Sequence, residues 1–152
     1  MKISFLVRWL PPRIDGVGDY TWNLACVLRQ YGIGVCVFTT AEQGCKGLVE
    51  NEWVFPIIKQ WQPKEVVKAL RSITRDAPDW FCFQYVPQMY GYWGICLQVA
   101  GILLALKKGF RCKIAITFHE IISSWGLNSR DILLDSIKLL HTRRLLSVAD
   151  LA

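Results

Sequence analysis

The stretch KISFLVRWLPPRIDGVGDYTWNLACVLRQYG, residues 2–32, contains three features in a row that decide the fold. Lys2–Arg8 is a compact apolar run, which predicts a buried β-strand. Trp9–Gly18 carries two prolines and two glycines, which predict a loop. Asp19 can cap a helix, and Gly32 can end one. Between them, large apolar residues recur at helical spacing: Tyr20, Leu24, Val27, Leu28 and Tyr31. The stretch therefore predicts a strand, a long loop and a helix.

The same alternation continues to the end of the chain. Further strands are predicted at Ile33–Thr40, Trp53–Ile58, Asp79–Tyr85 and Cys112–Phe118. Helices are predicted from Pro63 with Val66, Leu70 and Ile73 on its buried side, over Trp93–Lys108 with Gly109 closing it, and over Arg130–Val148 with Leu133, Ile137 and Leu140 on one face. Near-continuous apolar strands alternating with helices predict an α/β fold, a doubly wound, Rossmann-like parallel sheet covered on both sides. We see no linker or repeat, so residues 1–152 form one predicted domain.

Three predicted loops carry the unusual chemistry: Trp9–Gly18, Val86–Tyr92 and His119–Leu127. Right-handed crossovers place every strand-to-helix loop at the same edge of a parallel sheet. Ligands of open α/β sheets bind outside the carboxyl ends of the strands. The sequence therefore predicts that these three loops together border a binding site.

Composition limits the classes of partner. The net charge of +6 suits anionic ligands or an anionic lipid surface, but no aromatic residues interleave with a long basic stripe, so we expect no nucleic-acid binding. The six cysteines form no CxxC pair and no zinc spacing. Arg8 interrupts the first apolar run too early for a signal peptide. These features favour free thiols and a cytoplasmic location, with peripheral contact at the inner face of the membrane as a further expectation.

Gly16, Val17, Gly18, Asp19 and Tyr20 make up the first candidate binding segment. Two glycines just before a helix let the backbone approach a ligand, and the helix N-terminus offers N–H groups to a phosphate or carboxylate. A flexible turn with an ordinary cap is the competing interpretation. A dinucleotide site is disfavoured, because Thr21 stands where the fingerprint wants its third glycine. Glu42 could still imitate the ribose-binding acid, so a dinucleotide-dependent oxidoreductase is left open as a distant alternative.

The second candidate segment directly follows the strand that ends at Phe118. His119 is the candidate catalytic residue, because a histidine there can donate to a sugar hydroxyl or take a proton near neutral pH. Glu120 could orient it or accept from a hydroxyl. Amide and aromatic side chains suited to carbohydrate recognition cluster after the preceding strand: Gln84, Tyr85, Gln88, Tyr90 and Tyr92. We expect no metal and no cofactor. A polar loop rim is the competing interpretation of the cluster.

Together these segments resemble the N-terminal domain of GT-B glycosyltransferases, specifically the retaining glycosyltransferase family 4 group. The matching stretches are Ile14–Gly32, Asp79–Pro87 and Ile116–Ile121, and Ala149–Ala152 resembles the start of the next strand. The resemblance covers essentially the whole chain. Many family members have two adjacent glycines where this chain has Asp15 followed by Gly16.

The resemblance implies an acceptor-side domain of a retaining enzyme that transfers a sugar from a nucleotide-sugar donor to a sugar or lipid-linked acceptor. Gly16 and Gly18 would lie against the donor, and His119 would border the transferred sugar. Family members carry a second domain with the nucleotide pocket, so we expect this domain to be incomplete at its C-terminus. It would then be inactive alone and would need a separate C-terminal domain. A non-catalytic domain that binds glycans, lipid headgroups or a protein is the alternative.

Overall fold

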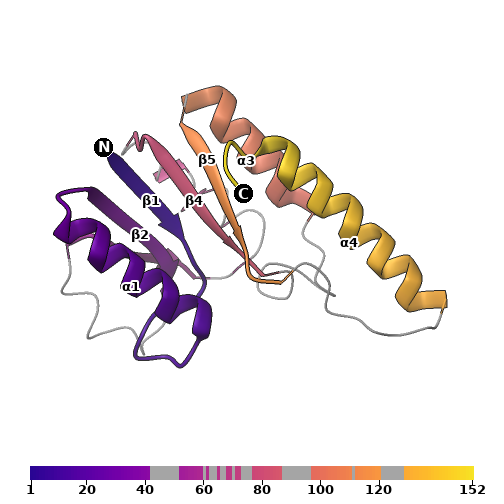
Figure 1. Cartoon of the computed structure of the whole chain (residues 1–152), viewed down its shortest axis with the longest axis horizontal. Helices are drawn as coiled ribbons and strands as arrows, with labels where there is room; N and C mark the ends of the chain where they lie inside the picture. Colours follow the sequence, from indigo (N-terminus) through magenta and orange to yellow (C-terminus); the bar gives the residue numbers. More distant parts are fainter. Residues whose placement is uncertain are drawn as a thin grey trace.

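A five-stranded sheet forms the centre of the computed structural model (Figure 1). The structure describes residues 1–41, 52–59, 61, 65, 68–69, 71–72, 77–86, 97–110, 112–120 and 129–152. The strands are β1 (Lys2–Leu6), β2 (Gly34–Thr40), β3 (Val54–Ile58), β4 (Trp80–Tyr85) and β5 (Lys113–Phe118). All neighbouring pairs are parallel, in the order β3-β2-β1-β4-β5. The predicted doubly wound, Rossmann-like α/β fold is therefore confirmed.

Helices cover both faces of this sheet. Helix α1 (Gly16–Gln30) lies on one face, and α3 (Leu97–Phe110) and α4 (Ser129–Val148) lie together on the other (Figure 1). The residues expected on the buried side of the helix after Pro63 lie outside the described residues. Within the described residues, no helix is both long and apolar enough to cross a membrane.

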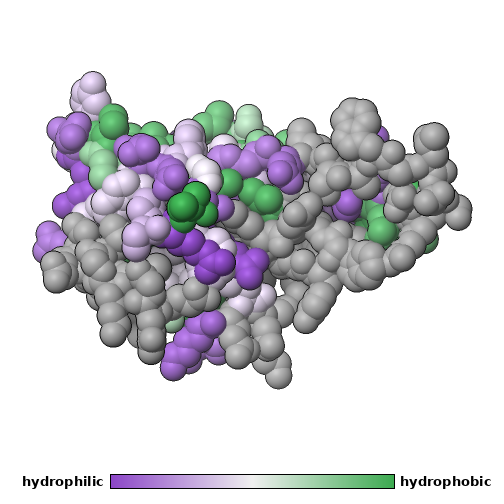
Figure 2. All heavy atoms as spheres, turned by 90° about the horizontal axis from the view of Figure 1, so that it is seen from below, coloured by the Kyte–Doolittle hydropathy of each residue, from purple (hydrophilic) through white to green (hydrophobic). Residues whose placement is uncertain are grey.

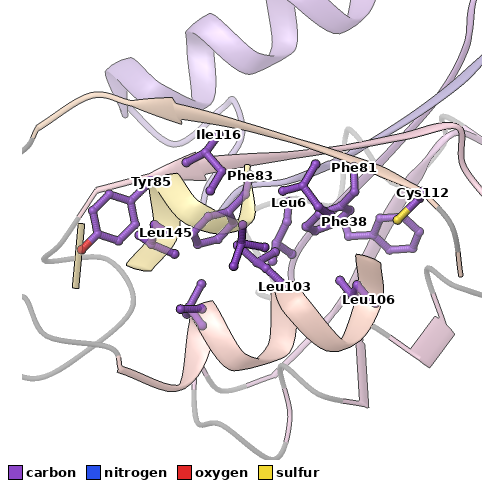
Figure 3. Packing of buried hydrophobic residues seen from close by; sticks show 14 of the residues in the cluster. Leu6, Phe38, Phe81, Phe83, Tyr85, Leu103, Leu106, Cys112, Ile116 and Leu145 are labelled. Atoms are coloured by element: carbon purple, nitrogen blue, oxygen red, sulfur yellow. The ribbon is translucent and has the colours of Figure 1, made fainter. Parts of the chain in front are cut away.

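The larger hydrophobic core lies between the sheet and the α3–α4 layer (Figure 3). The strands contribute alternate residues to it, because successive side chains of a strand point to opposite faces. Phe81, Phe83 and Tyr85 of β4 pack there, and Leu103 of α3 and Leu145 of α4 close it from the helical side. This burial explains why the strands read as continuous apolar runs.

The smaller core lies under α1, and small residues of that helix face it. The buried residues of α1 are Gly18, Thr21 and Ala25, whereas Tyr20, Val27 and Tyr31 are exposed. Small residues let the helix approach the sheet closely. The spacing of large apolar residues therefore predicted the helix correctly, although three of those residues are exposed and only Leu24 and Leu28 pack against the core.

The ends of α1 confirm one predicted cap and correct the other. Asp15, not Asp19, is the N-cap, and its Oδ2 accepts a hydrogen bond of 2.7 Å from the Gly18 N–H. The helix consequently begins at Gly16, four residues earlier than a cap at Asp19 would place it. Gly32 has φ +75°, a conformation that glycine adopts without strain, and this residue ends the helical segment as predicted.

The two helices of the other layer also differ from the prediction. Helix α3 runs through Gly109 to Phe110, so the glycine does not end it; the predicted start at Trp93 lies outside the described residues. In α4, Leu133 and Leu140 are exposed, while Lys138, His141, Leu145 and Val148 are buried. The face of α4 that carries Leu133 and Leu140 is therefore not the buried one, because the sheet and α3 bury a side that includes polar residues.

The last residues of the chain extend the sheet beside β5. Leu151 forms a parallel bridge with Ala115, and the Ile116 N–H donates to its carbonyl at 2.9 Å. Lys107 holds the neighbouring Asp150 through an ion pair of 2.8 Å. That hydrogen bond, with a second from the Ile114 N–H, lowers the pKa of Asp150. The predicted beginning of a strand at residues 149–152 is thus confirmed as a single bridge.

Candidate functional site

The strand order places a topological switch point between β1 and β4. From β1 the chain continues towards β2 and β3 on one side, whereas β4 and β5 lie on the other. In open α/β sheets, ligands bind outside the carboxyl ends of the strands at such a point. Figure 2 looks onto this edge from below, and the coloured atoms in the middle of the view are mainly hydrophilic. The candidate residues from three separate segments belong to this edge.

His119 is held at the edge by contacts with β4. Its backbone N–H donates to the Tyr85 carbonyl at 3.1 Å, and its Nε2 lies 2.8 Å from Gln84 Oε1. The parallel register pairs Tyr85 with Phe118, so His119 is the next residue beyond the last pair. Because alternate residues share a face, Gln84 and His119 both point to the α1 side of the sheet.

Tyr20 reaches the same histidine from α1. Its ring centroid lies 5.5 Å from that of His119 at an interplanar angle of 75°, an edge-on contact. Tyr20 is 46% exposed, so one side of its ring is open to a ligand. The structure thus brings together Tyr20, Gln84 and His119, three predicted site residues that lie far apart in the sequence.

Burial and charge act on His119 in opposite directions. Burial is the larger effect and lowers the pKa of the imidazole, while the carboxylates of Asp15 and Glu120 raise it. The net shift is downward, so the ring is neutral at pH 7. With Gln84 Oε1 assigned as the neighbouring atom, which can only accept, Nε2 of the neutral ring carries the proton and Nδ1 holds the lone pair. A neutral histidine in this tautomer can accept a proton at Nδ1.

Gly16 and Gly18, the two glycines in the first turn of α1, have different surroundings. A Cβ at Gly18 would lie 2.5 Å from the Trp9 carbonyl oxygen, closer than any side chain tolerates, whereas a Cβ at Gly16 meets nothing within 4 Å. Gly18 is therefore required for the close packing of α1 on the preceding loop. Only Gly16 offers backbone that a ligand could approach, so the expected role for two glycines is reduced to one.

The N-terminus of α1 is already occupied by acidic side chains. The Asp15 carboxylate takes the Gly18 N–H, and Asp19 adds a second carboxylate in the first turn. Negative groups at this position are stabilised by the helix dipole, and they also offset its attraction for an incoming anion. Val17 is half-buried against the α1-side core. The expected phosphate cradle is consequently weaker than the glycine pattern alone suggested.

Positive charge lies instead in the loop after β1. The Arg13 guanidinium carbon lies 3.6 Å from the centre of the Trp9 ring, and that of Arg8 lies 5.2 Å from it. Sequence reasoning did not single out Trp9. The sequence does place Arg8 one position before Trp9 and Arg13 four positions after it, a pattern that could have indicated the stack. This stack places two cations next to the carboxyl end of β1.

Tyr85 does not join the site. Its side chain is 1% exposed, lies in the core on the α3–α4 side and contacts Phe118 and His141 (Figure 3). It contributes only its backbone carbonyl to the position of His119. Glu120 is exposed beside the histidine. Tyr90 lies outside the described residues, as do Gln88 and Tyr92.

Neither the thiols nor the acidic residues form a metal site in the described part of the chain, where no group of three potential ligands is found. The four described cysteines, Cys26, Cys36, Cys82 and Cys112, are free. Burial raises the pKa of the Cys82 thiol to about 12 and also raises that of Cys112. Both therefore stay protonated and act as apolar side chains.

A dinucleotide fingerprint also fits poorly. Residues 7–15 separate β1 from α1, whereas the fingerprint requires a tight turn. Thr21, at the third glycine position, is fully buried and donates its hydroxyl to the Val17 carbonyl at 2.7 Å. Comparison of the chain with protein-family models and with curated proteins gives no match.

Proposed function

We propose that this chain is the N-terminal, acceptor-side domain of a retaining glycosyltransferase that uses a nucleotide-sugar donor. The observation that carries the proposal is the cluster of Tyr20, Gln84 and His119 at the switch point of a Rossmann-like sheet. An amide, a phenol and a neutral imidazole suit the hydroxyl groups and the ring faces of a sugar. The motifs that carry these residues are those that resemble the glycosyltransferase family.

The chemistry assigned to the site is mostly positioning. The side chain of Gln84 contacts the His119 ring and fixes its orientation. The Nδ1 atom of His119 can then accept a hydrogen bond from a sugar hydroxyl. The positively charged stack of Trp9 with Arg8 and Arg13 supplies cations for a diphosphate or for an anionic acceptor. Gly16 leaves room for a close backbone approach. No metal ion or cofactor is part of the proposal.

Sugar transfer also needs contacts to the nucleotide from the side that faces this domain. The proposal assigns these contacts to a separate C-terminal domain. Without it, the donor phosphates stay hydrated on one side, and each hydrogen bond exchanged with water contributes only about 0.5–1.5 kcal/mol. One or two such bonds do not offset the entropy of association. The chain alone is therefore expected to bind donors weakly and to transfer nothing. A cytoplasmic location with peripheral membrane contact belongs to the same proposal.

A second candidate function is a non-catalytic glycan-binding domain, and the acidic N-terminus of α1 favours it. Asp15 and Asp19 disfavour a diphosphate next to Gly16, whereas carboxylates accept readily from neutral sugar hydroxyls. In that case the same Tyr20, Gln84 and His119 cluster binds a neutral sugar. A lipid headgroup or a protein could also be the ligand of such a domain.

Titration of the isotope-labelled chain by NMR distinguishes the two functions. A panel of nucleotide sugars should shift the Gly16 amide and the His119 imidazole with dissociation constants no tighter than roughly 1 mM. Tyr20→Ala should abolish these shifts, and Tyr31→Ala, the same change at a more exposed tyrosine just beyond the other end of α1, should not. Shifts with neutral oligosaccharides alone would favour the glycan-binding domain. Sugar transfer by the chain alone that is lost in His119→Ala would show that it is a complete enzyme.

A further inference from the structure

Asp15 makes two of the hydrogen bonds that set the start of α1. Its Oδ2 accepts from the Gly18 N–H at 2.7 Å, and its carbonyl accepts from the Asp19 N–H at 2.9 Å. Its backbone is extended, with φ −156° and ψ 114°, as is usual for a residue that caps a helix. Tyr20 is the next residue along the helix. The two bonds of Asp15 therefore fix the turn that carries Tyr20.

The same turn is also held against the loop that precedes it. A Cβ added to Gly18 would lie 2.5 Å from the Trp9 carbonyl oxygen and 3.1 Å from Asp15 Oδ2, so the helix, the loop and the cap meet at this glycine. Thr21 is fully buried on the same side of α1. Because packed interiors leave few voids, the first turn has little freedom to rotate about the helix axis. The direction in which Tyr20 points is a consequence.

Tyr20 links this turn to His119. Its ring meets the imidazole edge-on, with centroids 5.5 Å apart, while Gln84 Oε1 lies 2.8 Å from Nε2 of the same imidazole. Gln84 is fully buried and belongs to β4, whereas Tyr20 is 46% exposed. The place of the Tyr20 ring therefore depends on the backbone of α1 more than on side chains packed around it. Of the two side-chain contacts to His119, one is set by the sheet and the other by the start of α1.

The charge of Asp15 also acts on the His119 ring. Asp15 and Glu120 are the two carboxylates that raise the pKa of this imidazole, against the larger lowering by burial, and Asp19 does not contribute. The side chains that contact the ring, Tyr20 and Gln84, are a phenol and an amide. A carboxylate near an imidazole stabilises its protonated form and so makes the neutral ring a better proton acceptor.

We propose that Asp15 is a positioning residue of the candidate site, which holds Tyr20 against His119 by capping α1. Its carboxylate serves the site a second time by strengthening the imidazole as an acceptor. An ordinary helix cap would contribute only to stability. The role assigned to the site rests on the proposed function, but the arrangement itself is tested without any sugar.

Proton NMR of the imidazole groups measures both effects. The chain has two histidines, so the His119 ring signals can be assigned by comparison with His141→Leu. Asp15→Asn keeps a good cap but removes the charge. It should lower the midpoint of the His119 titration and retain the NOE signals between the Tyr20 and His119 rings. Asp15→Ala removes the cap as well, so it should lower the midpoint and also lose these NOE signals.

Two matched variants serve as controls. Asp19→Asn makes the same change at the other carboxylate of the first turn, and it should leave both the His119 midpoint and the ring NOE signals as in wild type. Glu120→Gln should lower the midpoint and keep the NOE signals, because it removes charge without touching α1. Circular dichroism should show that every variant is folded, and Asp15→Asn retains its cap even where Asp15→Ala is less stable.

Two results would overturn the proposal. An unchanged His119 midpoint in Asp15→Asn would mean that Asp15 is only a helix cap. Intact NOE signals between the two rings in a folded Asp15→Ala variant would mean that the contact of Tyr20 with His119 does not depend on the cap. A chain that binds no sugar would contradict the proposed function and leave both results unaffected, so the two failures are distinguishable.

Discussion

Helices α1 and α4 both pack on the sheet, but they bury different kinds of side chain. Helix α1 buries the small residues Gly18, Thr21 and Ala25 and leaves larger side chains outside, so it approaches the sheet closely. Helix α4 buries Lys138 and His141 with its apolar residues and leaves a row of leucines outside. In both helices the periodic large apolar residues indicate the helix but not its buried face. The difference shows that the face is chosen by the space that the sheet offers.

The largest expected effect on the free energy of unfolding distinguishes the buried side of α4 from its exposed side. Leu145→Ala should lower the free energy of unfolding by about 3 kcal/mol, because the fully buried side chain leaves a cavity. Leu139→Ala, the same change at a residue that is 42% exposed, should cost less than about 0.5 kcal/mol. Urea denaturation measures both changes in the free energy of unfolding. Equal losses would mean that the assignment of the two sides is wrong.

The next effect separates the two glycines at the start of α1. Gly18→Ala should destabilise the fold by about 2 kcal/mol, because its Cβ would overlap the Trp9 carbonyl oxygen. Gly16→Ala has free space and should stay within about 0.5 kcal/mol of wild type. The same denaturation experiment compares them. A Gly18→Ala variant as stable as Gly16→Ala would contradict the close approach of α1 to its loop.

The buried histidine of α4 should make the stability depend on pH. Burial lowers the pKa of His141, with a smaller contribution from Arg144, and neither ring nitrogen has a hydrogen-bond partner among the described residues. The folded state then binds a proton less readily than the unfolded state. Stability is therefore highest above the unfolded pKa of about 6.5 and falls as the pH drops below it.

The variant His141→Leu tests this dependence. It should reduce the slope of unfolding free energy between pH 7 and pH 5, a slope that is at most about 1.4 kcal/mol per pH unit for one proton. The pKa of His119 is also lowered, so His119→Gln should reduce the slope as well. Denaturation across this pH range measures all three proteins. An unchanged slope in His141→Leu would mean that burial does not lower the pKa of this histidine.

The smallest effect concerns the two tyrosines of α1. Tyr20→Ala should cost about 0.5–1 kcal/mol, because it removes the edge-on contact with His119. Tyr31→Ala, at a residue that is 80% exposed beyond the end of the helix, should change stability by less than about 0.5 kcal/mol. Thermal unfolding compares them. If Tyr20→Ala were neutral, the ring contact would contribute nothing to the position of the histidine.

Much of the site followed from residue order alone. The loops after β1, β4 and β5 had to meet at one edge, and Tyr20, Gln84 and His119 do so. The outcome for Tyr85 could not be predicted in the same way. Gln84 and Tyr85 are adjacent, yet one faces α1 and the other faces α4, and only the placement of the helices decides which face borders the candidate site.

The sequence by itself determined the class of fold. Apolar strands, helical periodicity and the Gly32 end signal are local properties, and they predicted a parallel α/β sheet. Tertiary structure decided the rest, because it depends on contacts between distant residues. The clash that requires Gly18 and the partly polar buried side of α4 arise from packing against neighbouring elements. Periodicity states that a helix has two sides, and only the space beneath it determines which side is buried.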